Sequence, residues 1–238
     1  MSAGRERALH VVRLGAMPYA EALELQRDAA HARIAGELRE DLLLLVEHPP
    51  VVTLGRTAKN RNLIASRELL ATRGVELFEI ERGGDVTFHG PGQLVGYPIV
   101  DLKQHTRDLH WYLRQVEQAV IHALVAFGIA GELHEGYTGV WTGGRSRKIC
   151  SIGVHARDWV TWHGFALNIT TDLSYFDLII PCGISGVVMT SVARETGRAD
   201  IPMHEAEDAA IAGISSVFGL EPAELPREAL AARRVAAG

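Results

Sequence analysis

The spacing of apolar residues along the chain predicts many short strands and a few longer helices. Alternating patterns and short apolar runs, bounded by glycine, proline or other turn residues, are typical of strands. Such segments are found at 8–15, 41–48, 51–55, 75–82, 94–102, 139–143, 148–156, 159–164 and 165–170.

Apolar residues recur at helical spacing in other segments. Helices are predicted at 18–36, 66–74, 108–127 and 203–219. Ser66 is a candidate N-cap, because its side chain can accept a hydrogen bond from a free amide of the first turn. The alanine- and arginine-rich tail from Glu221 is expected to form a loose helix. Because strands and helices do not alternate regularly, a doubly wound parallel sheet is unfavoured and the pattern indicates an α+β fold in one domain.

Composition narrows the class of protein. Of the 238 residues, 47% are hydrophobic and 22% are charged, which is typical of a globular domain. The net charge of −5 argues against sequence-independent nucleic-acid binding, which needs a basic face. No apolar run approaches the roughly 20 residues that span a bilayer, and the first residues do not resemble a signal peptide. We therefore expect a cytoplasmic protein that binds neither nucleic acid nor membrane.

The eleven histidines and two cysteines do not suggest a metal site. No pair has the spacing of an HExxH motif or of a Cys/His zinc site, so no metal is expected. Two cysteines suit a reducing compartment, where each is most often a small buried apolar residue.

A glycine-rich segment, "RGGDVTFHGPGQLVGYPI" at 82–99, is the first candidate for chemistry. A tight hairpin would explain some of its glycines, but five glycines around Asp85, Thr87, His89 and Gln93 favour a binding loop, since glycine lets a ligand approach the backbone. The phosphate-binding patterns GxxxxGK[ST] and GxGxxG are absent.

Lys148 and Cys182 are the second candidate. In "KICSIGVHA", strand alternation puts Lys148 on the apolar face with Cys150. Most such lysines extend to the rim of the face, but one that loses water can act as a base or as the partner of a nucleophile. Cys182 lies in a Pro-Cys-Gly corner, where its sulfur can be exposed, and a neighbouring cation would favour the reactive thiolate. Cys150, in mid-strand, is expected to be buried.

These segments together carry a family resemblance. "LLLVEHPPVVTLGR" (43–56), "RGGDVTFHGPGQLVGYPIVDL" (82–102), "KICSIGV" (148–154), "HGFALN" (163–168) and "PCGI…TS" (181–191) resemble, in this order, the lipoyl(octanoyl) transferases. The resemblance covers roughly residues 10–195. Phe88 replaces a tyrosine that is frequent in that family, and the helix and tail at 203–238 are less family-like.

The resemblance implies a fold, a reaction and a site. The fold is that of the biotin and lipoate protein ligase catalytic domains: one domain, 1–238, with a mixed, largely antiparallel sheet flanked by helices. Cys182 corresponds to the nucleophile and Lys148 to its activating lysine. The implied substrate-binding residues are Arg82, Gly83, Gly84, Asp85, Val86, Thr87, Phe88, His89, Ser151, Ile152, Gly153, Gly164, Phe165 and Ala166.

The implied enzyme is an acyltransferase that acts without a cofactor in the first step of endogenous protein lipoylation. Its donor is octanoyl-acyl carrier protein. Its acceptors are the apo lipoyl domains of 2-oxoacid dehydrogenase complexes and the glycine cleavage H protein. Two alternatives remain: an ATP-dependent lipoate or biotin ligase, and a non-catalytic module that binds a carrier or a lipoyl domain. For the transferase, we expect Lys148 Nζ and Cys182 Sγ to lie roughly 3–4 Å apart, with His89 and His163 as the next candidate activators.

Overall fold

Two β-sheets and five α-helices make up the part of the chain that the computed structural model describes, residues 7–184 and 186–230. The helices are α1 (Tyr19–Ala35), α2 (Arg67–Thr72), α3 (Leu109–Val125), α4 (Val192–Thr196) and α5 (Met203–Phe218). Short 3-10 helices are found at η1 (Asn60–Asn62), η2 (Leu102–Gln104), η3 (Leu173–Leu178) and η4 (Pro181–Gly183).

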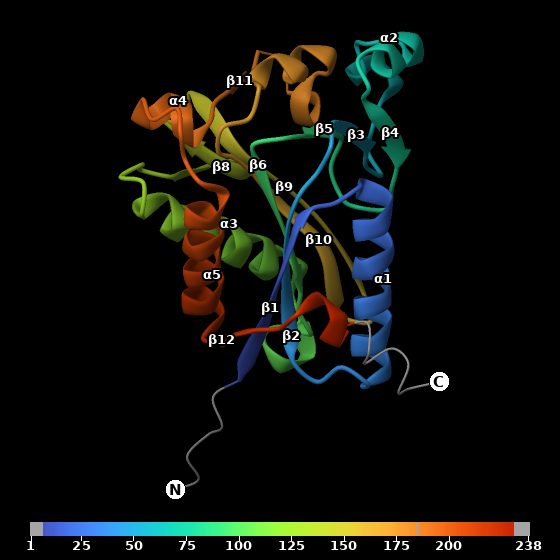
Figure 1. Cartoon of the computed structure of the whole chain (residues 1–238), viewed down its shortest axis with the longest axis vertical. Helices are drawn as coiled ribbons and strands as arrows, with labels where there is room; N and C mark the ends of the chain where they lie inside the picture. The colour runs from blue at the N-terminus through green and yellow to red at the C-terminus, as the bar shows by residue number, and fades with distance from the viewer. Residues whose placement is uncertain (1–6, 185, 231–238) are drawn as a thin grey trace, which may run out of the picture.

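The larger sheet runs through the middle of the molecule (Figure 1). Its strand order is β12-β1-β2-β6-β10-β9-β8-β7, and β11 pairs with β9 outside this path. The strands are β1 (Ala8–Ala16), β2 (Asp41–Glu47), β6 (Gln93–Ile99), β7 (Glu132–His134), β8 (Tyr137–Thr142), β9 (Arg147–Arg157), β10 (Val160–Asn168), β11 (Val188–Met189) and β12 (Glu221–Glu224). Pairing is antiparallel from β2 to β7, and parallel where β1 meets β2 and β12 and where β11 meets β9. The expected mixed, largely antiparallel sheet is confirmed.

Helices cover both faces of this sheet (Figure 1). In β2, Leu43 and Leu45 pack toward α3 and α5, whereas Leu42 and Leu44 pack toward α1. All four leucines are fully buried because neighbouring residues of a strand point to opposite faces. The continuous apolar run of β2 is thus explained by a strand that lies between two layers of helices.

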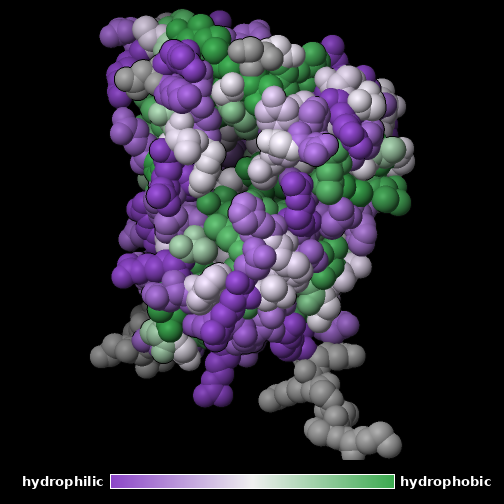
Figure 2. Space-filling view, turned by 180° about the vertical axis from the view of Figure 1, so that it is seen from behind, coloured by the Kyte–Doolittle hydropathy of each residue, from purple (hydrophilic) through white to green (hydrophobic). Residues whose placement is uncertain are grey.

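A second sheet, of three strands, lies at the end of the molecule that carries α2 (Figure 1). It has the order β4-β3-β5, with β3 (Val51–Leu54), β4 (Glu76–Glu79) and β5 (Val86–His89). Figure 2 shows apolar residues gathered at this end of the molecule, at the top of the view. Three large apolar side chains of this region are exposed: Ile64, Leu69 and Val188.

Most predicted elements are present, and three of the differences change the predicted order of elements. Residues 86–89, expected to be part of a loop, form strand β5 opposite β3. The two strands predicted at 159–164 and 165–170 are one strand, β10, because His163 takes a positive φ of 58° without interrupting the pairing with β9. The helix expected from Glu221 is wrong at its start, because residues 221–224 form strand β12 and pair with β1. The chain is helical at 227–230, and residues 231–238 lie outside the described residues. Within the described ranges, no helix is both long and apolar enough to cross a membrane.

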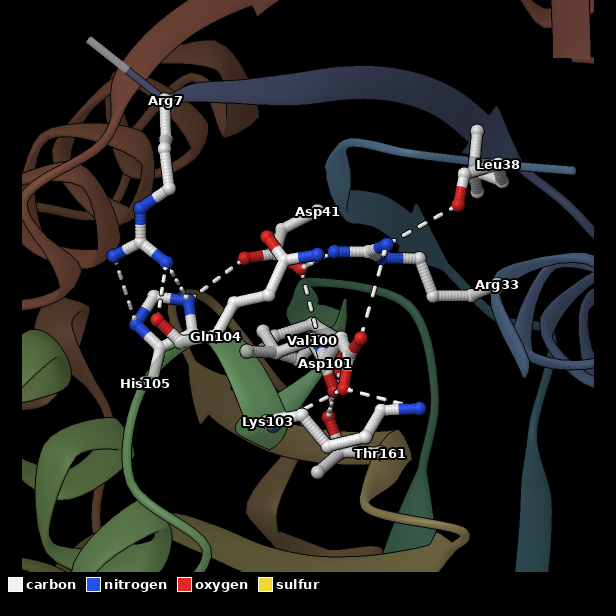
Figure 3. A network of polar contacts seen from close by, with 11 residues as sticks. Arg7, Arg33, Leu38, Asp41, Val100, Asp101, Lys103, Gln104, His105 and Thr161 are labelled. Carbon is white, nitrogen blue, oxygen red and sulfur yellow. Dashed lines mark hydrogen bonds and ion pairs between the residues drawn. The ribbon is translucent and has the colours of Figure 1, made fainter. Parts of the chain in front are cut away.

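A buried polar network joins α1 to one end of the larger sheet (Figure 3). Asp41, at the start of β2, accepts hydrogen bonds from Arg33 of α1 at 3.0 Å and from the amide of Asp101 at 3.0 Å. His105 Nε2 lies 2.8 Å from its other oxygen. Burial alone would raise the pKa of Asp41, but these contacts, led by the one to His105, hold it below the ordinary value.

We expect Asp41→Asn to lower the free energy of unfolding by about 3 kcal/mol, because it leaves the buried Arg33 without its carboxylate. Since the pKa of Asp41 is lowered on folding, its contribution is present above the ordinary Asp value of about 3.9 and is lost as pH falls below it. Urea unfolding of both proteins should therefore show a difference that shrinks toward acid pH. The matched control is Glu79→Gln, which breaks an exposed pair with Arg67 and should change little.

Candidate active site

Cys182 lies on a tight turn that presents its sulfur at the surface of a cavity. The turn is η4, closed by hydrogen bonds from Gly183 N to Ile180 O at 2.9 Å and from Ile184 N to Pro181 O at 3.0 Å. Cys182 has φ 55° and ψ 17°, a left-handed conformation that residues other than glycine rarely adopt. The surrounding structure must maintain this backbone strain, which is common at functional sites.

Lys148, in β9, points its ammonium group at this sulfur. Lys148 Nζ lies 3.1 Å from Cys182 Sγ and donates a second hydrogen bond to the carbonyl of Thr138 at 3.0 Å. The lysine is fully buried, and its Nζ is 5.4 Å from the centre of the Trp141 ring. A buried cation in contact with a thiol favours the thiolate, because Coulomb attraction is weakly screened there. The expected separation of roughly 3–4 Å is met.

The β8 strand shapes the space that Lys148 occupies. Gly139 has a φ of 130°, and a Cβ atom there would lie 2.7 Å from Lys148 Cε and 3.2 Å from Nζ. Its amide donates to Glu117 of α3, a buried carboxylate, at 2.9 Å. Glycine is therefore required at 139 for its backbone conformation and to leave room for the Lys148 side chain. The contact with Glu117 fixes β8, the strand next to the lysine, on α3.

The second cysteine has a different environment. Cys150 is fully buried in the core between the sheet and α3, and burial raises the pKa of its thiol. A neutral, enclosed thiol is a poor nucleophile. The structure thus agrees with the expectation that Cys150 is a core residue.

A cavity of about 410 Å³ opens beside Cys182. Thirteen of the sequence-predicted site residues line it: Arg82, Gly84, Asp85, Val86, Thr87, His89, Ser151, Ile152, Gly153, Gly164, Phe165, Ala166 and Cys182. The hydroxyl groups of Thr87 and Ser151, both in this lining, are buried and have no hydrogen-bond partner among the residues that the structure describes. Such groups are available to a ligand that enters the cavity.

Three predicted residues are not in the lining. Lys148 contacts Cys182, which lines the cavity, but does not line it itself. Gly83 donates its amide to Val154 O at 2.8 Å behind the lining. Phe88 stacks on Tyr175 with ring centres 4.7 Å apart, in the core of the smaller sheet. Alternation in β5 explains why the Phe88 side chain points away from the cavity, because its neighbours Thr87 and His89 point to the other face.

Arg82 brings a positive charge to the cavity wall. Its guanidinium group donates to Thr53 O at 2.7 Å and to Gly83 O at 3.0 Å, and burial lowers its pKa. Among the residues that the structure describes, no carboxylate forms an ion pair with it. A developing negative charge in the cavity would therefore meet a fixed cation.

The two histidines named as alternative activators do not take that position. His89 Nδ1 lies 2.8 Å from Gln93 Oε1, and burial lowers the pKa of His89 to about 3. His163 is buried as well, and burial lowers its pKa. Both rings stay neutral at physiological pH, and Lys148 is the cation beside the sulfur.

Sequence reasoning named Asp85 but missed Asn62, which helps to hold the cysteine turn. Asn62 N donates to Lys59 O, and Asn62 O accepts from Ile180 N at 2.7 Å. The Asn62 amide group donates to Asp85, which lies against Gly183. The contact between Asn62 and Ile180 joins segments more than 100 residues apart in the chain, and no local pattern in the sequence indicates it. No group of three or more His, Cys, Asp or Glu in the described ranges could hold a metal ion.

Comparison with known proteins identifies one family. The family model of the lipoyl protein ligase A/B catalytic domain matches residues 18–215. An octanoyltransferase of Rubrobacter xylanophilus is 53% identical over 218 residues, 90% of this chain and 96% of that protein. One of Chloroflexus aggregans is 48% identical over 217 residues, 91% and 97% of the two chains.

A solved structure, the bi-partite lipoate protein ligase of Thermoplasma acidophilum, has a TM-score of 0.75 at 17% identity, covering 97% of this chain and 91% of that one. At this identity the likeness shows the fold alone. The fold is thus that of the lipoate protein ligase catalytic domains. The chain belongs to the lipoyl protein ligase A/B catalytic domain family.

We expect Lys148→Ala to slow alkylation of Cys182 by iodoacetamide at neutral pH by about tenfold or more, since the thiolate loses its adjacent cation. Lys148→Arg should restore only part of the rate, because guanidinium does not release a proton and does not fit the same space. Peptide mass spectrometry over time would give the rate for each cysteine. An unchanged rate in Lys148→Ala would show that the contact has no effect on the thiol.

Gly139→Ala should reduce the reactivity of Cys182 nearly as far as Lys148→Ala does, because the new methyl group would overlap the lysine side chain. Gly144→Ala is the matched control: Gly144 also has a positive φ, of 68°, but a Cβ atom there meets nothing within 4 Å. Both variants carry backbone strain, so a loss of reactivity confined to Gly139→Ala would assign the effect to the position of Lys148.

Proposed function

We propose that this protein transfers an octanoyl group from acyl carrier protein to a lysine of a lipoyl domain, through a thioester on Cys182. The observation that carries the proposal is the 3.1 Å contact between Lys148 Nζ and Cys182 Sγ at the edge of a cavity. The octanoyltransferases that match most of this chain at about half identity support the same reaction.

In the first half-reaction, the Cys182 thiolate attacks the carbonyl carbon of the octanoyl thioester on the carrier. The bond between that carbon and the carrier sulfur breaks, and the carrier thiol leaves with a proton that Lys148 can supply. Negative charge develops on the carbonyl oxygen, where the unpartnered hydroxyl groups of Thr87 and Ser151 and the cationic Arg82 are available in the lining.

In the second half-reaction, the amine of the lipoyl-domain lysine attacks the acyl-Cys182 thioester. An amide bond forms, the Cys182 thiolate leaves, and the neutral Lys148 takes up the proton that the attacking nitrogen loses. Lys148 thus returns to its starting protonation state after each cycle. Because the intermediate is covalent, the two protein substrates can use the cavity mouth in turn.

The cavity mouth carries positive charge, which suits an acidic carrier. Lys59 and Arg61 line the cavity at exposed positions, and Arg56 is exposed in the same loop. Attraction between this loop and an acidic carrier would favour encounter and weaken as salt screens it.

Two other functions fit the site less well. An ATP-dependent lipoate ligase shares the fold, but ligation through an acyl adenylate gives no role to the contact between Lys148 and Cys182. A module that only binds a carrier or lipoyl domain gives no role to a strained cysteine beside a buried cation. We propose that the protein acts in protein lipoylation in the cytoplasm and uses no cofactor.

The test is intact-protein mass spectrometry after mixing the full chain with octanoyl carrier protein in the absence of ATP. We expect one octanoyl group on Cys182, which transfers to an apo lipoyl domain added afterwards. Cys182→Ser should form no adduct and lose at least about 1000-fold in transfer rate. Cys150→Ser, the matched control, should still form the octanoyl adduct and keep the transfer rate.

Two outcomes would contradict the proposal. The first is full transfer by Cys182→Ser, which would exclude the thioester. The second is transfer that requires ATP and free octanoate, which would point to the ligase.

A further inference from the structure

The sheet surface under the cavity is made of small residues. Alternation in β9 and β10 turns Ile152 and Phe165 toward the α3 side, where both pack in the core. Toward the cavity the two strands present Ser151, Gly153, Gly164 and Ala166. They lie opposite one another in pairs, Ser151 with Ala166 and Gly153 with Gly164. Ile152, His163 and Phe165 of the same strands also line the cavity, but this row of small residues leaves room for an extended ligand across the two strands.

The next strand, β6, closes this space with larger side chains. Val95 pairs with Ala166, continues the row that begins at Ser151, and is 1% exposed. Tyr97, on the same face of β6, is 3% exposed and also lines the cavity. The row therefore changes from small to branched and aromatic residues at β6.

A hydrogen bond to His48 holds the Tyr97 hydroxyl group in place. His48 Nδ1 lies 2.8 Å from the carbonyl of Met17, which can only accept, so this nitrogen carries the proton. His48 Nε2 is then the acceptor for the Tyr97 hydroxyl group at 2.8 Å. Burial lowers the pKa of His48 to about 4, which keeps the ring neutral and the arrangement intact. The end of the cavity is thus rigid.

The distances match an octanoyl chain. Neighbouring strands are about 4.8 Å apart, so β6 lies roughly 10 Å from β9, the strand that carries Lys148. An extended chain advances about 1.2 Å per bond, which gives roughly 8 Å from the carbonyl to the methyl end of an eight-carbon acyl group. An acyl chain that starts at Cys182 and crosses β9 and β10 would bring its methyl end to β6.

We propose that Val95 and Tyr97 form the end wall of the acyl site and set the length of the acyl chain that the protein accepts. This inference rests on the proposed function for the identity of the ligand. It adds β6 as the element that determines specificity, with two residues that are not among the individual substrate-binding residues implied by the family resemblance.

The test is calorimetric binding of free straight-chain fatty acids, from six to twelve carbons, to the full chain. Each buried methylene group should tighten binding about fourfold up to about eight carbons, and longer acids should gain nothing or bind more weakly. Val95→Ala, which removes two methyl groups, should move this limit up by one or two carbons. Val95→Ile, which adds one, should move it down.

Val46→Ala is the matched control. Val46 pairs with Val95 on β2, is 1% exposed and packs in the same core, but it does not line the cavity. It makes the same substitution one strand further along the row. We expect it to lower stability as Val95→Ala does and to leave the limit unchanged. Thermal unfolding of all variants would identify any that do not fold, and the opposite shift in Val95→Ile provides a second reading.

The results separate this inference from the proposed function. A limit that is the same in Val95→Ala, Val95→Ile and the unsubstituted protein, or no binding of any fatty acid, would overturn the end wall. A limit that moves as expected, together with no acyl group on Cys182 from octanoyl carrier protein, would support the end wall and contradict the thioester mechanism.

Discussion

The burial of one ammonium group sets the requirements for the rest of the site. Lys148 has no exposed surface, so each of its contacts must come from the protein. The Thr138 carbonyl and the Cys182 sulfur accept its hydrogen bonds, and the Trp141 ring lies nearby. The amide of Thr190 donates to the Lys148 carbonyl at 2.9 Å, so the segment after Cys182 is attached to the lysine strand as well. The proposed nucleophile, Cys182, and the adjacent Lys148 are therefore held by one small β-sheet region.

The two sheets contribute different residues to the candidate site. The larger sheet supplies a surface of small side chains and the lysine, while the smaller sheet and its loops supply Arg82, Thr87 and the support for the cysteine turn. The polar network at Asp41 lies on the larger sheet near the start of β2 (Figure 3) and holds α1 against it. A site built on strands in this way is more rigid than one built on loops alone.

Local patterns predicted much of this structure. The strand that begins at Lys148 and the Pro-Cys-Gly corner were evident from alternation and turn residues, and their contact followed from the family resemblance. Strand β5 was missed because its four residues are flanked by glycines that are typical of loops. The wall at Val95 and Tyr97 could not be predicted, because it depends on the register of β6 against β10. Register joins residues about 70 positions apart and has no local signal in the sequence.

The outer strands of the larger sheet have a consequence for how other proteins can approach it. At one edge, β12 is four residues long, begins and ends with a glutamate and contains Pro222, so it offers few free backbone amides. At the other edge, β7 has only three residues, two of them Glu132 and His134. Short, charged edge strands disfavour the addition of a foreign strand and so protect against sheet-to-sheet aggregation. A protein that delivers or receives a group at Cys182 must accordingly dock through side chains and loops.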